Sequence, residues 1–236
     1  MASVPTTITY AVGDIHGCYD QLIRLLSCCK KHSGDRPSRF VFLGDYIDRG
    51  PDSRKVVDFL IRAEASSPRQ FVCLRGNHEK LFSDAVASNA TGSQRAAWFQ
   101  NGGLETMASF DVTDIEAIPD THKVWLSSRP LTTDDGKRLY VHAGVRPGIP
   151  LEKQRERDLL WIREPFLSSP VDHGRLVVHG HTPTASGKPD IRSNRVNLDT
   201  GACFGGHLTA AAFSCEQIMP LAFINDAGQV SPWQGS

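Results

Sequence analysis

The 236-residue sequence predicts an α/β fold in which two packed, mixed β-sheets are flanked by helices. In the first half, short apolar runs alternate with helical segments, the order typical of parallel strands joined by right-handed crossovers. In the second half, strand-like runs follow one another with little helical signal, which predicts a second sheet packed on the first. Hydrophobic residues make up 40% of the chain, enough for a sizeable core.

The first half predicts three strand–helix units. The strands are the apolar runs Ile8 to Val12, Phe40 to Leu43 and Phe71 to Leu74. The first helix is expected to open at Gln21 with Asp20 as its N-terminal cap. The second is expected to begin at Pro51, and the third carries its apolar face on Leu81 and the residues after it.

The rest of the chain predicts an insertion and the second sheet. Residues 93–129 indicate helices and irregular loops that lie over the site, within a single domain spanning residues 1–236. Residues 131–133 and 139–141 predict a hairpin with its turn at Asp135-Gly136. Further strands of this half are expected at residues 176–178, 196–198, 208–213 and 221–224, and a helix at residues 155–161.

Composition and charge exclude several classes of protein. The formal net charge is zero, which argues against a nucleic-acid binder. No apolar run approaches the roughly 18 residues that a membrane span needs. Residues 1–5 show no signal-peptide pattern, so we expect a cytoplasmic protein whose six cysteines are reduced thiols.

Three blocks that follow the first three strands indicate a metal site. They read Gly13-Asp14-Ile15-His16-Gly17, Gly44-Asp45-Tyr46-Ile47-Asp48-Arg49-Gly50 and Gly76-Asn77-His78-Glu79. Sites in open α/β sheets assemble at the carboxyl ends of strands. Asp, Asn and His side chains delivered there form a ligand set suited to two divalent cations. Two later strand ends, Tyr140 to Gly144 and Val177 to Pro183, bring further histidines beside glycines.

Together these blocks resemble the metal-dependent phosphoprotein phosphatases, also called calcineurin-like metallophosphoesterases. The resemblance runs from about Val12 to Phe213 and implies the αββα sandwich of that family. Trp161 to Glu164 and Leu198 to Ala202 resemble the compact bacterial and phage-type serine/threonine protein phosphatases. Symmetrical diadenosine tetraphosphatases are close relatives of these. The Ser-Ala-Pro-Asn-Tyr loop of the eukaryotic enzymes is absent, so no regulatory subunit is implied.

The resemblance also implies the metal ligands. Asp14 and His16 would hold the first metal, Asp45 would bridge both, and Asn77, His142 and His181 would complete the second. The ions would be Mn²⁺, with Fe, Zn, Ni or Co as alternatives. A hydroxide bridging the two metals would attack phosphorus in line, with no phospho-enzyme.

Two further sets of side chains are implied around the metals. His78 would be the general acid, with Asp48 orienting it and keeping it charged; the alternative for His78 is a hydrogen bonder outside the reaction. Arg49, Arg75 and Arg163 would clamp the phosphate, with a surface salt bridge as the alternative for Arg163. Asp199 is expected to fix a turn rather than bind metal, and His179 to pack locally. Trp98 and Phe99 would either roof the pocket or form the core of the insertion.

The expected substrates are phosphoserine and phosphothreonine monoesters, with phosphotyrosine as a further option. The expected partner is a phosphorylated protein or a small phosphoester. Glu79 favours this reading because the tetraphosphatases usually have Asp there. The insertion also offers only scattered cations, at Arg95, Lys123 and Arg129, where a polyphosphate would need a cluster. The alternative is a symmetrical diadenosine tetraphosphatase, and a more remote one is an inactive metal-binding module. Neither nucleic acid nor membrane is expected as a partner.

Overall fold

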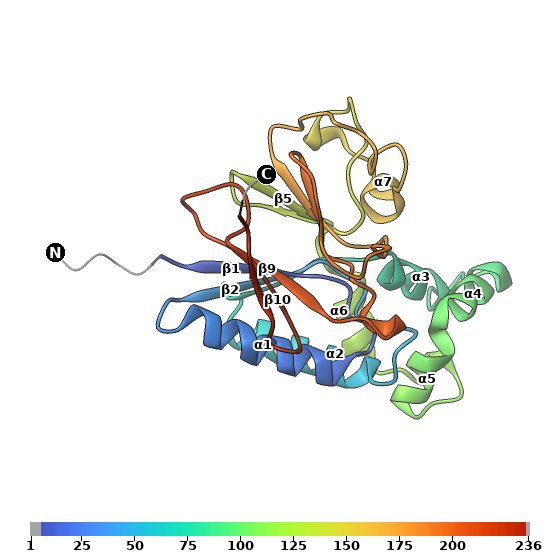
Figure 1. The fold of residues 1–236 in the computed structure, drawn as a ribbon. Coiled ribbons are helices and arrows are strands. Elements are labelled where there is room, and N and C mark those ends of the chain that lie inside the picture. The colour runs from blue at the N-terminus through green and yellow to red at the C-terminus, as the bar shows by residue number, and fades with distance from the viewer. Residues whose placement is uncertain (1–5, 235–236) are drawn as a thin grey trace.

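A computed structural model describes residues 6–234 of the chain, which stack in four layers. Helices α1 and α2 cover one face of a six-stranded sheet, and a five-stranded sheet packs on its other face (Figure 1). The helix α7 lies on the outer side of the five-stranded sheet. This arrangement matches the two mixed sheets flanked by helices that the sequence predicts.

The six-stranded sheet has the order β11-β10-β9-β1-β2-β3. Its strands are β1 Ile8–Val12, β2 Ser38–Phe42, β3 Phe71–Cys73, β9 Thr209–Phe213, β10 Ala222–Asn225 and β11 Val230–Pro232. The first three run parallel, as predicted, and β9 joins β1 antiparallel. Their carboxyl ends therefore open onto one edge, towards α3 (Figure 1).

The assignment of residues 208–213 and 221–224 to the second sheet was wrong. Strand β9 lies beside β1, with Ala211 opposite Ala11, and β10 extends that sheet outward. The small side chains explain the placement. Ala210 and Ala212 pack in the core under the helices while Ala211 packs between the two sheets, so β9 is buried on both faces.

The five-stranded sheet has the order β4-β5-β6-β8-β7. Its strands are β4 Thr132–Asp134, β5 Arg138–Val141, β6 Leu176–His179, β7 Asp190–Ile191 and β8 Arg195–Asn197. The predicted hairpin is β4–β5, and β5, β6 and β8 run parallel to one another. Strands β7 and β11 were not predicted.

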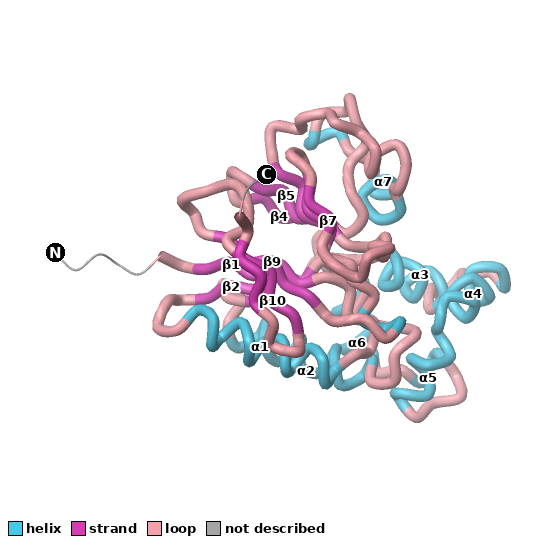
Figure 2. The backbone as a smooth tube through the Cα atoms, in the orientation of Figure 1, coloured by secondary structure: helices cyan, strands magenta, loops and turns pink. Residues whose placement is uncertain are grey.

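Within residues 6–234, seven α-helices surround the sheets. Figure 2 draws the helices in cyan. They are α1 Tyr19–Ser33, α2 Ser53–Ser66, α3 Asn77–Ala85, α4 Gly92–Trp98, α5 Leu104–Phe110, α6 Asp120–Ser127 and α7 Glu156–Trp161. Asp20 is not a cap, because α1 already begins at Tyr19 and Asp20 lies in its first turn. There its carboxylate still faces the positive end of the helix dipole. Helix α2 begins at Ser53, two residues beyond Pro51.

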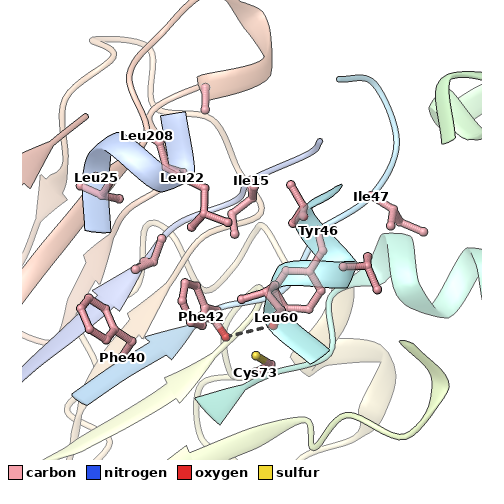
Figure 3. Close-up of a cluster of buried hydrophobic side chains, with 14 of the residues drawn as sticks. Ile15, Leu22, Leu25, Phe40, Phe42, Tyr46, Ile47, Leu60, Cys73 and Leu208 are labelled. Carbon is pink, nitrogen blue, oxygen red and sulfur yellow. Dashed lines mark hydrogen bonds between the residues drawn. The ribbon is translucent and has the colours of Figure 1, made fainter. Parts of the chain in front are cut away.

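The largest core lies between the six-stranded sheet and its helices. Phe40 and Phe42 of β2 meet Leu22 and Leu25 of α1, and the Tyr46 ring lies among them (Figure 3). The Tyr46 hydroxyl donates to the carbonyl of Leu74 at 2.6 Å, so the loop after β2 is tied to the end of β3. This packing fixes the segments that carry the site.

Helices α4 to α6 share that core. Trp98, Phe110 and Trp125 are buried in the cluster that contains the first-sheet residues. Trp98 is fully buried, which makes it a core residue rather than an exposed roof of the pocket. The six cysteines are free thiols. Among residues 6–234, no helix has both the length and the apolar character to cross a membrane.

Candidate dimetal site

Five loops bring the predicted site residues together. Asp14 and His16 follow β1, Asp45 to Arg49 follow β2, and Asn77 and His78 open α3 after β3. His142 follows β5 and His181 follows β6, so both sheets contribute. Each of the six predicted metal ligands is buried.

The backbone is strained at this place. Among the described residues, six non-glycine residues have positive φ: His16, Asp45, Asp48, Arg49, Asp111 and His181. All but Asp111 are predicted site residues. Such conformations cost on the order of 1 kcal/mol or more each and persist where the surroundings enforce them. The strain therefore coincides with the site and turns these side chains inward.

Asp45 lies at the centre of the arrangement. Its carboxylate oxygens are 3.5 Å from Nε2 of His16 and 3.4 Å from Nε2 of His142, on different oxygens. Two groups of side chains could each hold a metal ion, His16 with Asp45 and His78, and Asp45 with His142 and His181. Asp45 belongs to both groups, which is the position a bridging carboxylate requires.

Hydrogen bonds set the histidine rings in the form that binds metal. Nδ1 of His16 lies 2.8 Å from the carbonyl oxygen of Ile47, and Nδ1 of His142 lies 3.0 Å from that of Leu43. Because a carbonyl only accepts, each Nδ1 carries the proton and each Nε2 keeps its lone pair towards Asp45. Burial lowers the pKa of both imidazoles well below the usual value, which keeps them neutral.

Asn77 joins the second group through its side-chain oxygen. Oδ1 of Asn77 lies 2.8 Å from Nε2 of His142 and 2.7 Å from Nδ1 of His181. The three groups thus converge on one point, on the side of Asp45 that faces the second sheet. An amide oxygen and two imidazole nitrogens are ordinary ligands of divalent transition metals.

Asp14 stands at the rim of the cluster. Its two carboxylate oxygens accept the backbone N–H of His181 at 3.1 and 3.0 Å. A Cβ on Gly180 would lie 2.0 Å from Oδ1 of Asp14, so only glycine permits this approach. Burial, and then the charges of Asp199 and Asp45, raise the pKa of Asp14 well above its usual value. Buried carboxylates that repel one another fit a site for cations, which would relieve both costs.

Glu79 is fully buried and fixes two of the loops. Its carboxylate accepts the backbone N–H groups of Asp45, Tyr46 and Gly76, each at 2.8 Å. A Cβ on Gly76 would lie 2.1 Å from Oδ1 and 2.4 Å from the backbone nitrogen of Asp45, so the second and third blocks pack closely at this glycine. The residue type at position 79 therefore acts on loop geometry, which weakens it as an indicator of substrate.

His78 and Asp48 form the predicted pair. Nδ1 of His78 lies 2.7 Å from Oδ2 of Asp48. Burial lowers the pKa of His78 to about 3 and raises that of Asp48 to about 8. In the metal-free protein these shifts favour an uncharged imidazole beside a protonated carboxyl at neutral pH, whereas the expectation was a charged imidazole beside a carboxylate. The Nε2 atom of His78 lies 3.9 Å from Oδ2 of Asp45, so this residue is also a candidate ligand.

The insertion holds Asp48 in place, which the sequence did not reveal. Nε1 of Trp98 donates to both carboxylate oxygens of Asp48, at 3.0 and 3.1 Å, and the Thr106 hydroxyl donates to Oδ1 at 2.7 Å. These two residues lie about fifty positions further along the chain. The one signal in the sequence is Trp98 itself, because a buried indole N–H needs a hydrogen-bond acceptor.

The three predicted clamp arginines differ in their surroundings. Nη1 of Arg49 lies 2.7 Å from Nε2 of His16, so Arg49 reaches the site. Nη1 of Arg75 lies 3.9 Å from the Glu156 carboxylate, and its buried Nε has no hydrogen-bond partner among the described residues. Arg163 is exposed and forms no ion pair with any residue of the 6–234 range, so the surface salt bridge is not observed.

Two residues outside the predicted set behave as expected. Oδ1 of Asp199 accepts the N–H of Gly201 at 3.1 Å, which closes a turn. Nδ1 of His179 lies 3.1 Å from the carbonyl oxygen of Gly180 and its ring packs against Phe166. Both are local structural contacts.

Comparisons with known proteins show which family and which solved fold the chain is similar to. The calcineurin-like phosphoesterase family model matches residues 9–209. The asymmetrical bis(5'-nucleosyl)-tetraphosphatase PrpE of Anoxybacillus flavithermus is 31% identical, with 86% of this chain and 89% of the relative covered. Serine/threonine-protein phosphatase 1 of Salmonella typhimurium is 32% identical over 86% and 90% of the two chains. The crystal structure of a candidate diadenosine tetraphosphatase superposes with a TM-score of 0.65 at 24% identity, covering 100% of this chain and 97% of the other.

Proposed function

The chain belongs to the calcineurin-like phosphoesterase family, and from this premise we propose that it hydrolyses phosphate esters by direct attack of water on phosphorus at a two-cation site. The single observation that carries the proposal is the position of Asp45, which is shared by two groups of potential metal ligands. The neutral histidine tautomers and the mutually repelling carboxylates support it. The coarser statement, that the chain is a metallophosphoesterase, follows from the family itself.

The residues that would hold the cations are the predicted six. Asp14, His16 and Asp45 would hold the first, and Asp45, Asn77, His142 and His181 the second, with Mn²⁺ as the ion we propose. Two divalent cations held by these residues would supply positive charge for the phosphate oxygens and would lower the pKa of water towards neutrality. No side-chain nucleophile is then needed.

The remaining side chains act on the substrate. We assign Arg49, Arg75 and Arg163 to the phosphate oxygens, which guanidinium groups bind in bidentate fashion. His78 would give the proton on its Nε2 to the leaving oxygen, while its Nδ1 takes up the proton held between His78 and Asp48. The approaching phosphate is negatively charged, and it raises the pKa of a neighbouring imidazole towards the value that an acid needs. Trp98 and Thr106 keep Asp48 oriented.

Two substrate classes compete. Phosphoserine and phosphothreonine monoesters are the class that the sequence favours, and a serine/threonine-protein phosphatase is among the relatives. Dinucleoside tetraphosphates are the second class, and relatives of similar identity bear that name. These relatives are named asymmetrical tetraphosphatases, whereas the alternative predicted from the sequence is a symmetrical one. The assay therefore also has to identify which phosphate bond is cleaved. A cluster of arginines beside the site, described below, favours the second class.

The test compares three substrates on one metal-loaded preparation. Purified protein is assayed with p-nitrophenyl phosphate, a phosphothreonine peptide and diadenosine tetraphosphate, with and without a chelator. The proposal expects hydrolysis of at least the aryl ester, abolished by chelation and restored by Mn²⁺. A protein that binds two Mn²⁺ ions and hydrolyses none of the three would instead be an inactive metal-binding module.

A further inference from the structure

A cavity lined by arginines adjoins the dimetal site on the side of α7. It has a volume of about 400 Å³, and its walls include Arg146, Arg155, Arg157 and Arg163 together with the indole of Trp161. Ligand pockets for small molecules have volumes in this range. The four arginines come from two segments, the loop after His142 and the stretch around α7.

The cavity is connected to the metal cluster by direct contacts. The Trp161 ring meets the His181 ring edge-on, with their centroids 6.1 Å apart. The Ala143 N–H, next to His142, donates to the carbonyl of Leu159 in α7 at 2.9 Å. The wall of the cavity is therefore in contact with His181 and with the residue next to His142, so the cavity lies beside two of the predicted ligands.

The positive charge of the cavity is only partly balanced. Asp158 accepts two hydrogen bonds from Arg146, at 2.9 and 2.5 Å, and Glu164 accepts the Ser168 hydroxyl at 2.5 Å. Within residues 6–234, no carboxylate forms a salt bridge with Arg155, Arg157 or Arg163. Three exposed guanidinium groups are thus left for an anion from outside.

The insertion, residues 93–129, has no unpaired cation among its side chains. Arg95 pairs with Glu116 at 3.0 Å, Lys123 pairs with Asp120 at 3.2 Å, and Arg129 pairs with Glu64. The three cations of the insertion are therefore paired, and the unpaired cations that a polyphosphate would need lie around α7 instead.

We propose that the arginine cavity is a second anion subsite, which binds phosphate groups of a nucleoside polyphosphate whose scissile phosphate lies at the metals. This inference rests on the proposed function and names its substrate class. Guanidinium groups match phosphate oxygens in geometry, and each contact is charge-assisted. The side chain of Trp161 is 39% exposed and offers a face on which a nucleobase can stack.

The test removes the two cavity arginines that have no assigned part in the phosphate clamp. In the Mn²⁺-loaded enzyme, Arg155→Ala/Arg157→Ala should lower the ratio of kcat/KM for diadenosine tetraphosphate to kcat/KM for p-nitrophenyl phosphate by about tenfold or more, mainly through KM. The matched control is Arg62→Ala/Arg69→Ala. It removes two exposed arginines, Arg62 within α2 and Arg69 just before β3. That control should leave the ratio within about twofold of wild type. Neither arginine lines the cavity, and salt screens the effect of exposed charges on a bound substrate.

Other outcomes overturn the inference. An unchanged ratio in the cavity variant, or an equal drop in the control variant, would show that the cavity holds no part of this substrate. A selective loss on a doubly phosphorylated peptide, without loss on the dinucleotide, would assign the cavity to a protein substrate instead. Metal-dependent hydrolysis of p-nitrophenyl phosphate reports separately on the proposed function, so the two failures are distinguishable.

Discussion

At the scale of single residues, the site is prepared for cations by hydrogen bonds and strain. Carbonyl acceptors at Ile47 and Leu43 orient His16 and His142 so that their unprotonated Nε2 atoms face Asp45. Asp45 itself is held with positive φ. Without cations these features lower the free energy of unfolding, because buried carboxylates lie near one another. Cations that bind only the folded state would raise it again.

His78 is the residue whose part is most open to test. We expect His78→Asn to keep two metals per chain and to reduce turnover on a phosphothreonine peptide by roughly two orders of magnitude. The loss should be smaller with p-nitrophenyl phosphate, because a good leaving group needs little protonation. Parallel assays of both substrates, with elemental analysis of the variant, provide the measurement.

Two results would revise the role of His78. Loss of one metal ion from His78→Asn would make His78 a ligand, which its distance from Asp45 allows. Equal losses on the aryl and alkyl esters would leave it as a structural hydrogen bonder.

At the scale of elements, Glu79 joins the loops that the parallel strands deliver. Helix α3 begins after a three-residue loop that follows β3, and in its first turn the Glu79 carboxylate accepts backbone N–H groups of the neighbouring loop. A single side chain thus sets the spacing between the Asp45 and Asn77 segments. Strand packing brings these segments to one edge, and Glu79 fixes their separation.

Replacing that carboxylate tests the assignment. Glu79→Gln keeps the shape but leaves one acceptor oxygen in place of two, so at least one buried N–H loses its partner. We expect the free energy of unfolding of the metal-free protein to fall by about 2 kcal/mol, measured by urea denaturation. The exposed Glu105→Gln is the matched control and should change it by less than about 0.5 kcal/mol. Equal stability of the two variants would contradict the part given to Glu79.

At the scale of the whole molecule, the metal cluster sits where the two sheets meet. The first sheet supplies the Asp14, Asp45 and Asn77 loops, and the second supplies His142 and His181. Between them, Ala11, Val41 and Leu43 pack against Tyr140 and Val178, so the ligands rest on a common apolar layer. The second cation group includes residues from both sheets, and it forms only when the sheets are packed.

The sequence alone predicted those parts of the fold and the site that depend on short segments of the chain. The three strand-end blocks and the parallel order followed from apolar runs bounded by glycine. The sheet membership of β9 did not, because its partner β1 lies about 200 positions away and an alanine run suits either sheet. The contacts of Trp98 and Thr106 with Asp48, and the convergence of Arg146 with Arg155 and Arg157, are likewise products of tertiary packing.

The central claim is that Asp45 organises two cation sites, and the metal content of Asp45→Asn tests it most directly. Wild-type protein and two variants are stripped with a chelator, reloaded with Mn²⁺, desalted and analysed for metal per chain. We predict two ions in the wild type, two in the exposed control Asp120→Asn, and fewer than one in Asp45→Asn, because both sites lose a charged ligand. Two retained ions in Asp45→Asn, or a wild type fully active without metal, would contradict the account.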